Sequence, residues 1–336
     1  MKVAVIGAGV IGITTAYELA TQGHQISVFE RNGAAAEECS FSNTGVASVG
    51  YAAPWARPGM VKHVLSHLWQ RDTPLRIANA SMSDWRWLWQ MRKACDSNTF
   101  ARNRASMLRL AEYSNHRMRT LSDTLNLEHE RSQGLMVLLR TEREIKLMHD
   151  TLQVMRDAGL SFKTLNAEEA RSIEPALNPE TSLAQAIHFP EDEVGNCRQF
   201  TLLLKSEAEA LGVKFFFNTS VQPLSNAQPK TIRTSAQDMG EKFDAVVVCA
   251  GLASAQLVRP LGLRIPLTAV HGYAISAAVR EPLDAPRSGV VDEQYKVAIS
   301  RLGQRVRVSG GSEIGGNAKR HDDMAPDPRH AISIAP

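Results

Sequence analysis

The stretch that decides the fold is KVAVIGAGVIGITTAYELATQGHQISVFE, residues 2–30 of a chain of 336. Its first five residues, Lys2–Ile6, form a short and largely β-branched run, which is typical of a buried parallel strand. A glycine-rich turn follows, and apolar residues then recur at helical spacing up to Ala20. Gly23 ends the helical pattern, and Gln25–Glu30 predicts a second strand. The stretch therefore predicts a strand–helix–strand unit.

The turn of this unit has the sequence Gly7-Ala-Gly-Val-Ile-Gly12, which is the GxGxxG pattern. Glycines at these positions allow a tight turn and let the backbone approach a pyrophosphate at the positive N-terminus of the helix. Glu30, 18 residues after Gly12, can accept hydrogen bonds from both ribose hydroxyls and would repel a 2′-phosphate. The alternative is a glycine-rich turn without a ligand. The complete strand–turn–helix context favours a dinucleotide site.

Two later segments favour FAD over NAD as the dinucleotide. Ser40-Phe-Ser-Asn-Thr-Gly45 offers hydroxyls, an amide and a close-approach glycine where a flavin chain would continue past the pyrophosphate. Asp244-Ala-Val-Val-Val-Cys-Ala-Gly251 predicts a second buried strand that ends in small residues, suited to pass beside a cofactor. Neither segment decides the question by its chemistry, because an ordinary buried strand with a glycine turn has the same pattern.

The composition fits a globular protein and excludes several function classes. Hydrophobic residues make up 43% of the chain and charged residues 22%, which argues against global disorder. The net charge of +3 is small and no polybasic run accompanies it, so no nucleic acid partner is expected. Cys39, Cys95, Cys197 and Cys249 lie far apart and never as CxxC, which predicts neither a metal site nor a disulfide framework. This cysteine usage favours a reducing compartment.

The apolar stretches predict neither a signal peptide nor a membrane span. Val3–Ile13 follows a single basic residue, and no small-residue cleavage site comes after it. The best later candidate, Ala245–Val258, contains Ser254 and Gln256. We therefore expect a cytoplasmic protein, either soluble or peripheral on the inner face of the cell membrane.

Beyond residue 30 the sequence alternates loop, helical and strand patterns. Residues 31–62 are rich in Gly, Ala, Ser and Pro and predict mostly loop, and residues 63–130 predict helix. Pro175, Pro179 and Pro190 are expected to interrupt regular structure. Further helices are predicted at 142–158 and 199–211, and strands at 134–139, 213–217 and 243–249. An antiparallel sheet is predicted from the runs 270–279, 289–292, 297–300 and 306–309.

Motifs spread along the chain add a family resemblance to these patterns. Besides the N-terminal unit and the SFSNTG segment, they are Tyr51-Ala-Ala-Pro-Trp-Ala56, Trp85-Arg-Trp-Leu-Trp89, Arg109-Leu-Ala-Glu-Tyr-Ser114, Phe189-Pro-Glu-Asp192, Val248-Cys-Ala-Gly251, His271-Gly-Tyr273, Asp292-Glu-Gln-Tyr-Lys296 and Arg305-Val-Arg-Val-Ser-Gly310. With them the chain resembles the bacterial D-amino acid dehydrogenases of the small-subunit type, within the FAD-dependent D-amino acid and glycine oxidase superfamily. The resemblance runs from residue 1 to about residue 316.

The resemblance implies an α/β fold, with a Rossmann-like FAD-binding domain of the GR2 type and an interleaved antiparallel-sheet substrate domain. The implied FAD-binding domain is discontinuous and comprises 1–85 and 190–262. The substrate domain comprises 86–189 and 263–316, and 317–336 is expected to be a disordered tail. The implied activity is the oxidative deamination of D-amino acids, D-alanine among them, to 2-oxo acids and ammonia. Electrons would pass to a quinone or another respiratory acceptor.

The resemblance also implies which residues face the substrate and the cofactor. Tyr51 and Tyr273 are the candidate catalytic residues, because a phenol can hydrogen-bond a substrate carboxylate. Ordinary packing is the alternative for both tyrosines. No metal ligand is expected. The implied FAD-binding residues are Val3, Ala4, Val5, Ile6, Gly7, Ala8, Gly9, Val10, Ile11, Gly12, Ile13, Glu30, Arg31, Ser40, Asn43, Gly45, Val221, Ala250 and Gly251.

The sequence lacks the family's arginine anchor for the substrate carboxylate. Arginine is the natural anchor because its planar fork binds a carboxylate with two hydrogen bonds. In the family it lies in a Trp-Arg-Gly/Leu-Arg-Pro-like segment, which is missing here together with the closing glycine-rich turn and helix. The resemblance therefore implies a truncated or frame-shifted chain that binds FAD weakly and turns over slowly or not at all. Arg301, Arg305 and Arg307 are not expected to replace the anchor. Arg305 and Arg307 share one face of a predicted strand and are predicted to be solvated.

One predicted helix carries aromatic residues on a single face. Trp85, Leu88 and Trp89 are spaced i, i+3, i+4, with Arg86 and Arg92 beside them. Aromatic rings with basic neighbours suit a membrane interface, where a quinone-linked enzyme works. A stripe packed in the protein core is the alternative that this spacing favours.

Three rival functions remain open at the level of sequence. A glycine- or sarcosine-type amine oxidase would release hydrogen peroxide. A non-catalytic fragment is favoured by the missing arginine segment. An NAD-dependent dehydrogenase is disfavoured by the contexts of the SFSNTG and VVVCAG segments.

Overall fold

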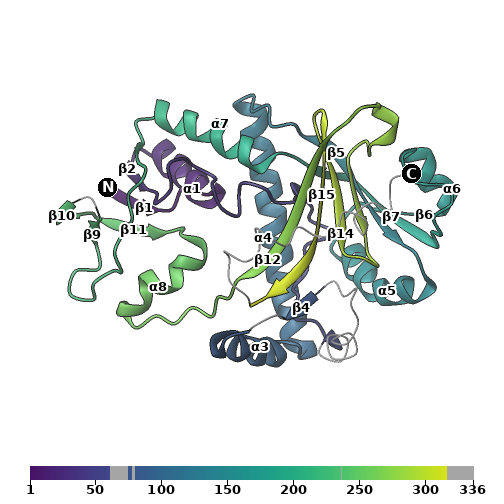
Figure 1. Ribbon diagram of the computed structural model, residues 1–336, viewed down its shortest axis with the longest axis horizontal. Coiled ribbons are helices and arrows are strands. Elements are labelled where there is room, and N and C mark those ends of the chain that lie inside the picture. The colour runs from purple at the N-terminus through teal and green to yellow at the C-terminus, as the bar shows by residue number, and fades with distance from the viewer. Residues whose placement is uncertain (61–74, 78–79, 236, 316–336) are drawn as a thin grey trace. The chain divides into compact units, whose positions relative to one another are not determined.

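The computed structural model describes residues 1–60, 75–77, 80–235 and 237–315 (Figure 1). Two compact units share these residues. The first unit comprises Met1–Asn43, Leu127–His129 and Asn196–Thr268; the second comprises Thr44–Asn126, Glu130–Gly195 and the chain from Ala269. Each unit is therefore discontinuous in sequence. The segment that begins at Thr44, expected to lie with the N-terminal strand–helix–strand unit, belongs to the second unit.

A parallel sheet forms the centre of the first unit. Its described strands are β1 (Lys2–Ile6), β2 (Gln25–Phe29), β8 (Lys214–Phe216) and β11 (Ala245–Val248), in the order β11-β1-β2-β8. All three pairings are parallel, as the buried β-branched runs predict. The predicted α/β fold class is confirmed by this sheet and the helices on it.

Helices and a small hairpin cover the two faces of this sheet. On one face, α1 (Val10–Thr21) packs against β1, β2 and α7 (Cys197–Ala210). On the other, Ile6 and Phe29 form a buried cluster with Ile232, Phe243 and Leu257. These last residues come from β9 (Thr231–Thr234), which pairs with β10 (Gln237–Lys242), from the segment before β11, and from α8 (Ser254–Val258). Short 3-10 helices flank α8 at Gly251–Ala253 and Arg259–Leu261.

A larger mixed sheet forms the centre of the second unit. Its main path is β12-β15-β14-β13-β5-β7-β3, with β4 paired to β15 and β6 to β7. All pairings are antiparallel except β13 with β5 and β15 with β4. The antiparallel strands predicted from residue 270 onward thus form one part of this sheet, and strands from earlier in the chain form the rest. The strands are β3 (Val46–Ala47), β4 (Leu75–Ile77), β5 (Ser132–Leu139), β6 (Lys163–Leu165), β7 (Gln185–Val194), β12 (Val270–Ala278), β13 (Gly289–Asp292), β14 (Val297–Leu302) and β15 (Arg305–Ile314).

Two helices cover opposite faces of this mixed sheet. Successive side chains of β5 point to opposite faces, so Leu135 and Val137 pack with α5 (Glu142–Asp157), whereas Met136 and Leu138 pack with α6 (Ala167–Ile173). Both helices begin at a capping side chain. Thr141 accepts from the backbone N–H of Glu144, and Asn166 accepts from that of Glu169.

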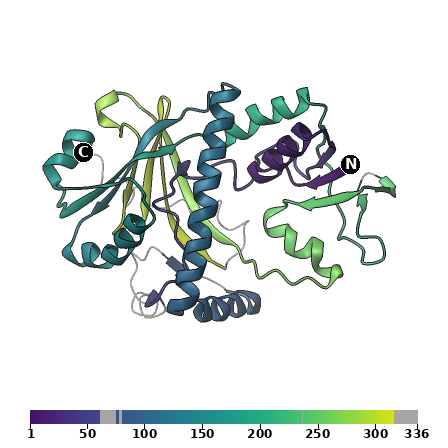
Figure 2. The same cartoon turned by 180° about the vertical axis from the view of Figure 1, so that it is seen from behind.

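Two further helices, α3 (Met82–Ala94) and α4 (Ser97–Thr124), meet at an angle at residues 95–96, as Figure 2 shows. The turn between them is fixed by Asp96, whose carboxylate accepts from the backbone N–H of Thr99 at 3.0 Å. In α3 no residue is buried, and Trp85 and Trp89 are 55% and 54% exposed. The core-stripe interpretation of these tryptophans is therefore wrong. Residues 61–74 of the predicted loop and helix lie outside the described residues.

Strand β7 runs through a proline that was expected to interrupt regular structure. The register between β5 and β7 shifts between the pairs Gln133–Glu193 and Leu135–Phe189, which places Pro190 within a bulge. A proline has no N–H to donate, and a bulge is where a strand tolerates that loss. The expectation for Pro190 is thus wrong, because the bulge that accommodates the proline forms only in the pairing of β7 with β5.

The glycine-rich turn after β1 is closely packed on its own unit. Gly7 has φ +105°, and a Cβ there would lie 2.5 Å from the carbonyl oxygen of Cys249. A Cβ at Gly12 would lie 1.8 Å from the carbonyl oxygen of Gly7. Both contacts are with backbone atoms, so no side-chain movement can relieve them. Glycine is therefore required at both positions by the fold itself.

We expect Gly12→Ala to lower the free energy of unfolding by about 1–3 kcal/mol or more, because the new methyl group overlaps the Gly7 carbonyl. Gly33→Ala is the matched control, since the nearest atom to its Cβ is the Asn218 Oδ1, at 3.6 Å. This control should stay within about 0.5 kcal/mol of the parent. Urea unfolding of the three proteins measures the difference, and equal stabilities would contradict the packing described for the turn.

Candidate functional site

The N-terminus of α1 is the first part of the candidate dinucleotide site. Its N-cap residue is Gly9, which has no capping side chain, and its first turn holds no acidic residue. The Ser40 Oγ accepts a hydrogen bond from the backbone N–H of Val10 at 3.0 Å. The positive end of the helix therefore has a hydroxyl beside it and no carboxylate in its own first turn, which suits a bound pyrophosphate.

Glu30, at the end of β2, is the second part of this site. Its Oε2 accepts from the backbone N–H of Ala8 at 2.8 Å, and its Oε1 accepts from that of Asn32 at 2.9 Å. These two bonds fix the carboxylate beside the glycine-rich turn. Each carboxylate oxygen can accept a second hydrogen bond, so ribose hydroxyls can be bound without breaking either contact.

The third part of the candidate dinucleotide site is the short segment that follows β11. The close approach of Gly7 to Cys249 brings Ala250 next to the turn, 3.2 Å from the Cβ position of Gly7. Gly251 follows with φ +53° and no atom within 4 Å of its Cβ position. Small residues thus lie beside the glycine-rich turn, where a side chain would fill the space that a cofactor needs.

These features of the first unit fit FAD. The turn presents three glycines without side chains, a helix N-terminus and a fixed carboxylate, which are the groups that a dinucleotide uses. The residues that would hold it are Gly7, Gly9, Gly12, Glu30, Ser40 and Ala250. The structure brings all six together within one unit.

The other residues expected to bind FAD differ in burial and in the contacts that they make. Val3–Ile6 and Ile13 are buried, so they contribute a strand and a helix face that carry the turn. Ile11 is 64% exposed at the start of α1. Arg31 forms an ion pair with Glu38. Val221 bridges to Thr234 and packs against the cluster that contains Phe29 and Phe243.

Asn43 and Gly45 stand on either side of the division between the units. Asn43 ends a segment of the first unit. Gly45 lies in the second, where its φ is +72° and its Cβ position is 2.4 Å from the carbonyl oxygen of Gly195. The Gly195 N–H donates to the Gly45 carbonyl at 2.8 Å. The glycine at position 45 is therefore explained by packing inside the second unit.

Tyr51, a candidate catalytic residue, belongs to a polar network in the second unit. Its hydroxyl donates to the Glu293 Oε2 at 2.9 Å, and Glu293 forms an ion pair with Lys296. Burial raises the pKa of Tyr51 to about 12, and the charge of Arg57 lowers it to a smaller extent. The phenol is thus protonated across the physiological range and acts as a hydrogen-bond donor.

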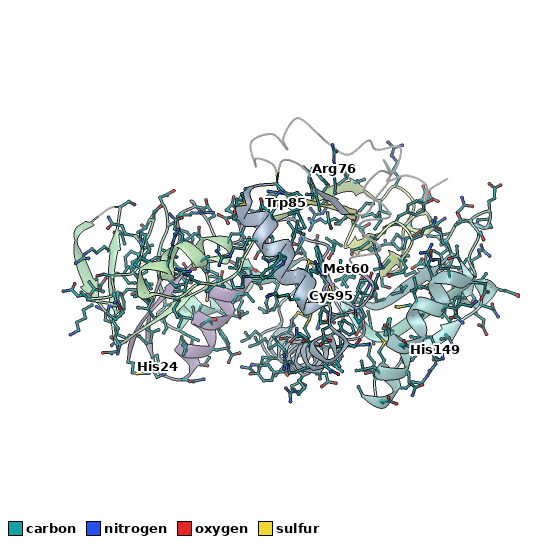
Figure 3. The ribbon with its side chains drawn as sticks, turned by 90° about the horizontal axis from the view of Figure 1, so that it is seen from below. His24, Met60, Arg76, Trp85, Cys95 and His149 are labelled. Carbon is teal, nitrogen blue, oxygen red and sulfur yellow. The ribbon has the colours of Figure 1, made fainter. Side chains whose placement is uncertain are left out.

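Tyr273, the second candidate, lies on β12 and contacts another carboxylate. Its hydroxyl is 3.4 Å from the Glu313 Oε2, and burial and the charge of Glu313 raise its pKa. Glu313 is opposite Arg76 in the pairing of β15 with β4, and the charge of Arg76 acts on Tyr273 in the opposite direction. Arg76 is labelled in Figure 3.

The two tyrosines lie at the same end of the mixed sheet. Tyr273 is opposite Gly310 of β15, and the Cβ position of Gly310 is 2.8 Å from the side chain of Val297 on β14. Val297 directly follows Lys296, the ion-pair partner of Glu293. Tyr51 contacts Glu293, so its hydroxyl also lies at this end of the sheet.

The position of Arg307 corrects the prediction that this arginine is solvated. Arg307 is buried, and its Nε donates to the Ser276 Oγ at 3.1 Å, so the prediction of a solvated Arg307 is wrong. Arg305 is exposed and pairs with Glu130 at 2.9 Å. Both arginines lie on one face of β15 between β12 and β14, so strand alternation alone does not distinguish the buried Arg307 from the exposed Arg305.

Sequence reasoning missed the carboxylates that contact the two tyrosines. Glu293 was part of the Asp292–Lys296 motif but received no role, and Glu313 received none either. Tyr51 and Glu293 are 242 positions apart, and Tyr273 and Glu313 are 40 apart. A single sequence carries no signal for such pairs.

The described part of the chain holds neither a candidate metal site nor a membrane-spanning helix. No group of three or more His, Cys, Asp and Glu side chains there is arranged to hold a metal ion. Within residues 1–60, 75–77, 80–235 and 237–315, no helix has the length and apolar character needed to span a bilayer.

Comparison with known proteins connects these features to a family. The family model described as DAO, FAD dependent oxidoreductase, matches residues 2–335. That match extends beyond residue 316, where the sequence resemblance was expected to end. A D-amino acid dehydrogenase from Bradyrhizobium diazoefficiens is 38% identical over 339 residues, which cover 99% of this chain and 80% of the relative.

Solved structures share the fold at lower identity. Glycine oxidase from Geobacillus kaustophilus is similar over 98% of this chain and 79% of its own, with a TM-score of 0.69 and 20% identity. L-Proline dehydrogenase from P. horikoshii is similar over 100% and 77%, with a TM-score of 0.68 and 16% identity. The predicted family and the predicted cofactor, FAD, are confirmed. The chain belongs to the DAO family of FAD-dependent oxidoreductases.

Proposed function

We propose that this oxidoreductase is a D-amino acid dehydrogenase, which converts D-amino acids to 2-oxo acids and ammonia. The observation that carries the proposal is the 38% identity to a D-amino acid dehydrogenase over nearly the whole chain. The dinucleotide half-site built around Gly7, Glu30 and Ser40 supports it. D-Alanine is the proposed substrate, and a quinone or a similar respiratory carrier is the proposed electron acceptor.

The reaction depends more on binding and orienting the substrate than on acid–base catalysis. FAD, when bound, supplies the acceptor for the hydride that leaves the substrate α-carbon. The substrate amine must be neutral when the hydride leaves, and it loses a proton to give an imino acid. Water then converts the imino acid to the 2-oxo acid and ammonia. The protein supplies the groups that bind the substrate and hold its α-carbon in place for this transfer.

We assign substrate binding to the end of the mixed sheet that carries Tyr51 and Tyr273. Tyr51 keeps its proton because its pKa is about 12, so a substrate carboxylate that takes the place of Glu293 can accept the hydrogen bond from its hydroxyl. Arg57 and Arg76 bring positive charge to Tyr51 and Tyr273 respectively. These arginines lie outside the segment that carries the anchor in the family, and they would supply the positive charge that a substrate carboxylate needs.

The visible spectrum of the purified chain tests the proposed function. We expect a flavin spectrum that bleaches when D-alanine is added without oxygen, and that does not bleach with L-alanine. A colourless protein, or a flavin spectrum unchanged by D-alanine, would contradict the proposal. It would favour the alternative of a non-catalytic protein.

The same preparation distinguishes a dehydrogenase from an amine oxidase. With D-alanine and a quinone analogue, turnover should proceed without oxygen consumption. Oxygen uptake matched by hydrogen peroxide would instead identify the glycine- or sarcosine-type oxidase. Substrate and cofactor are the same in both assays, so the comparison isolates the electron acceptor.

Removing the phenolic hydroxyls tests the substrate-binding assignment. We expect Tyr51→Phe and Tyr273→Phe each to lower kcat/KM for D-alanine by about 10- to 100-fold, as for the loss of a hydrogen bond to a charged group. Tyr113→Phe is the matched control, because Tyr113 is 67% exposed on α4. Unfolding temperatures and flavin content should be measured for all variants. Normal kcat/KM in both folded variants would remove the tyrosines from the site.

We also propose that α3 contacts the membrane surface, where a quinone acceptor resides. Trp85 and Trp89 are about half exposed, and Met82 is 86% exposed. Trp85 is labelled in Figure 3. Arg86, Arg92 and Lys93 lie on the same helix, and the Lys93 Nζ is 3.7 Å from the centroid of the Trp89 ring. Exposed aromatic rings with basic neighbours suit an anionic bilayer surface.

Sedimentation with anionic phospholipid vesicles tests this contact. We expect Trp89→Ala to reduce the bound fraction several-fold, because the indole ring is lost from the interface. Leu110→Ala, which removes an exposed apolar side chain from α4, should leave binding unchanged. Equal binding by the parent and the folded Trp89→Ala variant would remove the membrane interpretation.

A further inference from the structure

The segment 48–51, which directly follows β3 and ends at Tyr51, is held against β7. The backbone pairing of β3 with β7 ends at Ala47 and Glu193. Beyond that pair, a Cβ at Gly50 would lie 2.3 Å from the ring of Phe189, so the backbone of the segment lies directly on β7. The position of Tyr51 therefore depends on β7 as well as on the contact of its hydroxyl with Glu293.

Asp192 of β7 makes the polar contacts with this segment. It is 5% exposed; its Oδ2 accepts from the Ser48 hydroxyl, and its Oδ1 accepts from the backbone N–H of Val49 at 3.3 Å. The backbone N–H of Gly50 also donates to this carboxylate. The Ser48 Oγ in turn accepts from the backbone N–H of Tyr51 at 2.8 Å. Hydrogen bonds thus connect the buried carboxylate with the backbone of Tyr51.

The bulge in β7 explains how this carboxylate reaches the segment. Asp192 lies between Phe189 and Glu193, where the regular pairing of β7 with β5 is interrupted, and a bulge turns side chains away from the alternation of a strand. Burial raises the pKa of the Asp192 carboxyl, whereas the hydrogen bonds from 48–50 and the charge of Arg119 lower it. A buried carboxylate is costly without such donors, so it holds the backbone that supplies them.

We propose that Asp192 is a positioning residue: through Ser48 it fixes the backbone of Tyr51 and so keeps the phenol at the substrate-binding end of the sheet. This inference rests on the proposed function, in which Tyr51 binds the substrate carboxylate. That carboxylate is present in the ground state and in the transition state alike. Loss of the positioning should therefore raise KM more than it lowers kcat.

A double-mutant cycle with D-alanine tests the proposal. We expect Asp192→Asn to raise KM by about 5- to 10-fold and to leave kcat within about twofold, because an amide cannot accept all the hydrogen bonds of the carboxylate. In the Tyr51→Phe background the same change should alter kcat/KM by less than about twofold, since the hydroxyl that Asp192 positions is gone. Glu191→Gln, the equivalent change at an exposed position of β7, is the matched control and should behave as the parent does.

Amide hydrogen exchange, followed by mass spectrometry, provides a measurement that does not depend on turnover. In Asp192→Asn the amides of Val49, Gly50 and Tyr51 should exchange at least about tenfold faster than in the parent, because their acceptors are weakened. Exchange in β13 should stay unchanged and so show that the second unit remains folded. If Asp192→Asn does not fold, Ser48→Ala serves in its place, because it removes the hydroxyl that joins Asp192 to Tyr51.

Equal losses of kcat/KM in Asp192→Asn with and without Tyr51→Phe would overturn the proposal, since the effect would then not pass through Tyr51. Parent-like kinetics, or parent-like exchange at 48–51, in the folded variant would overturn it as well. A parent chain that does not oxidise D-alanine would end the proposed function. The exchange measurement would still decide whether Asp192 fixes the segment, so the two failures are distinguishable.

Discussion

The pairing of β11 with β1 is the constraint on which the rest of the chain depends. Val3–Ile6 pair in register with Ala245–Val248, so the first strand of the chain is completed by a strand from its last third. This pairing brings the Cys249 carbonyl against Gly7 and sets the small residues after β11 beside the glycine-rich turn. Because the two strands are far apart in sequence, most residues of the second unit are inserted between them.

A buried carboxylate has a comparable role in the second unit. Asp292 is completely buried; its Oδ2 accepts from the Arg140 Nε at 2.6 Å, and its Oδ1 accepts from the backbone of Gln294 and Tyr295. These bonds fix the turn that carries Glu293 and Lys296. The position of Tyr51 therefore rests on an ion pair that would leave an uncompensated charge if either partner were lost.

The sequence allowed the strand–helix–strand unit to be predicted because it depends on local patterns. Gly7, Gly12 and Glu30 lie within one stretch, and the roles proposed for them in binding the flavin follow from their spacing. Strand β7 was not expected to cross Pro190, since the bulge that tolerates the proline exists only when β5 lies beside it. The exposure of Trp89 and the burial of Arg307 likewise depend on which elements cover them, and helical or strand periodicity does not contain that information.

The parallel pairing of β13 with β5 has a consequence for how the protein folds. Residues 196–268, which complete the first unit, lie between these two strands in the chain. The sheet of the second unit can close only after the whole first unit has left the ribosome. Such non-local pairing slows folding, because the entropy of closing a long loop is lost before its contacts form. We therefore expect one edge of the apolar strand β5 to stay unpaired until β13 has been synthesised, so that chaperone binding and growth temperature affect the yield of the protein.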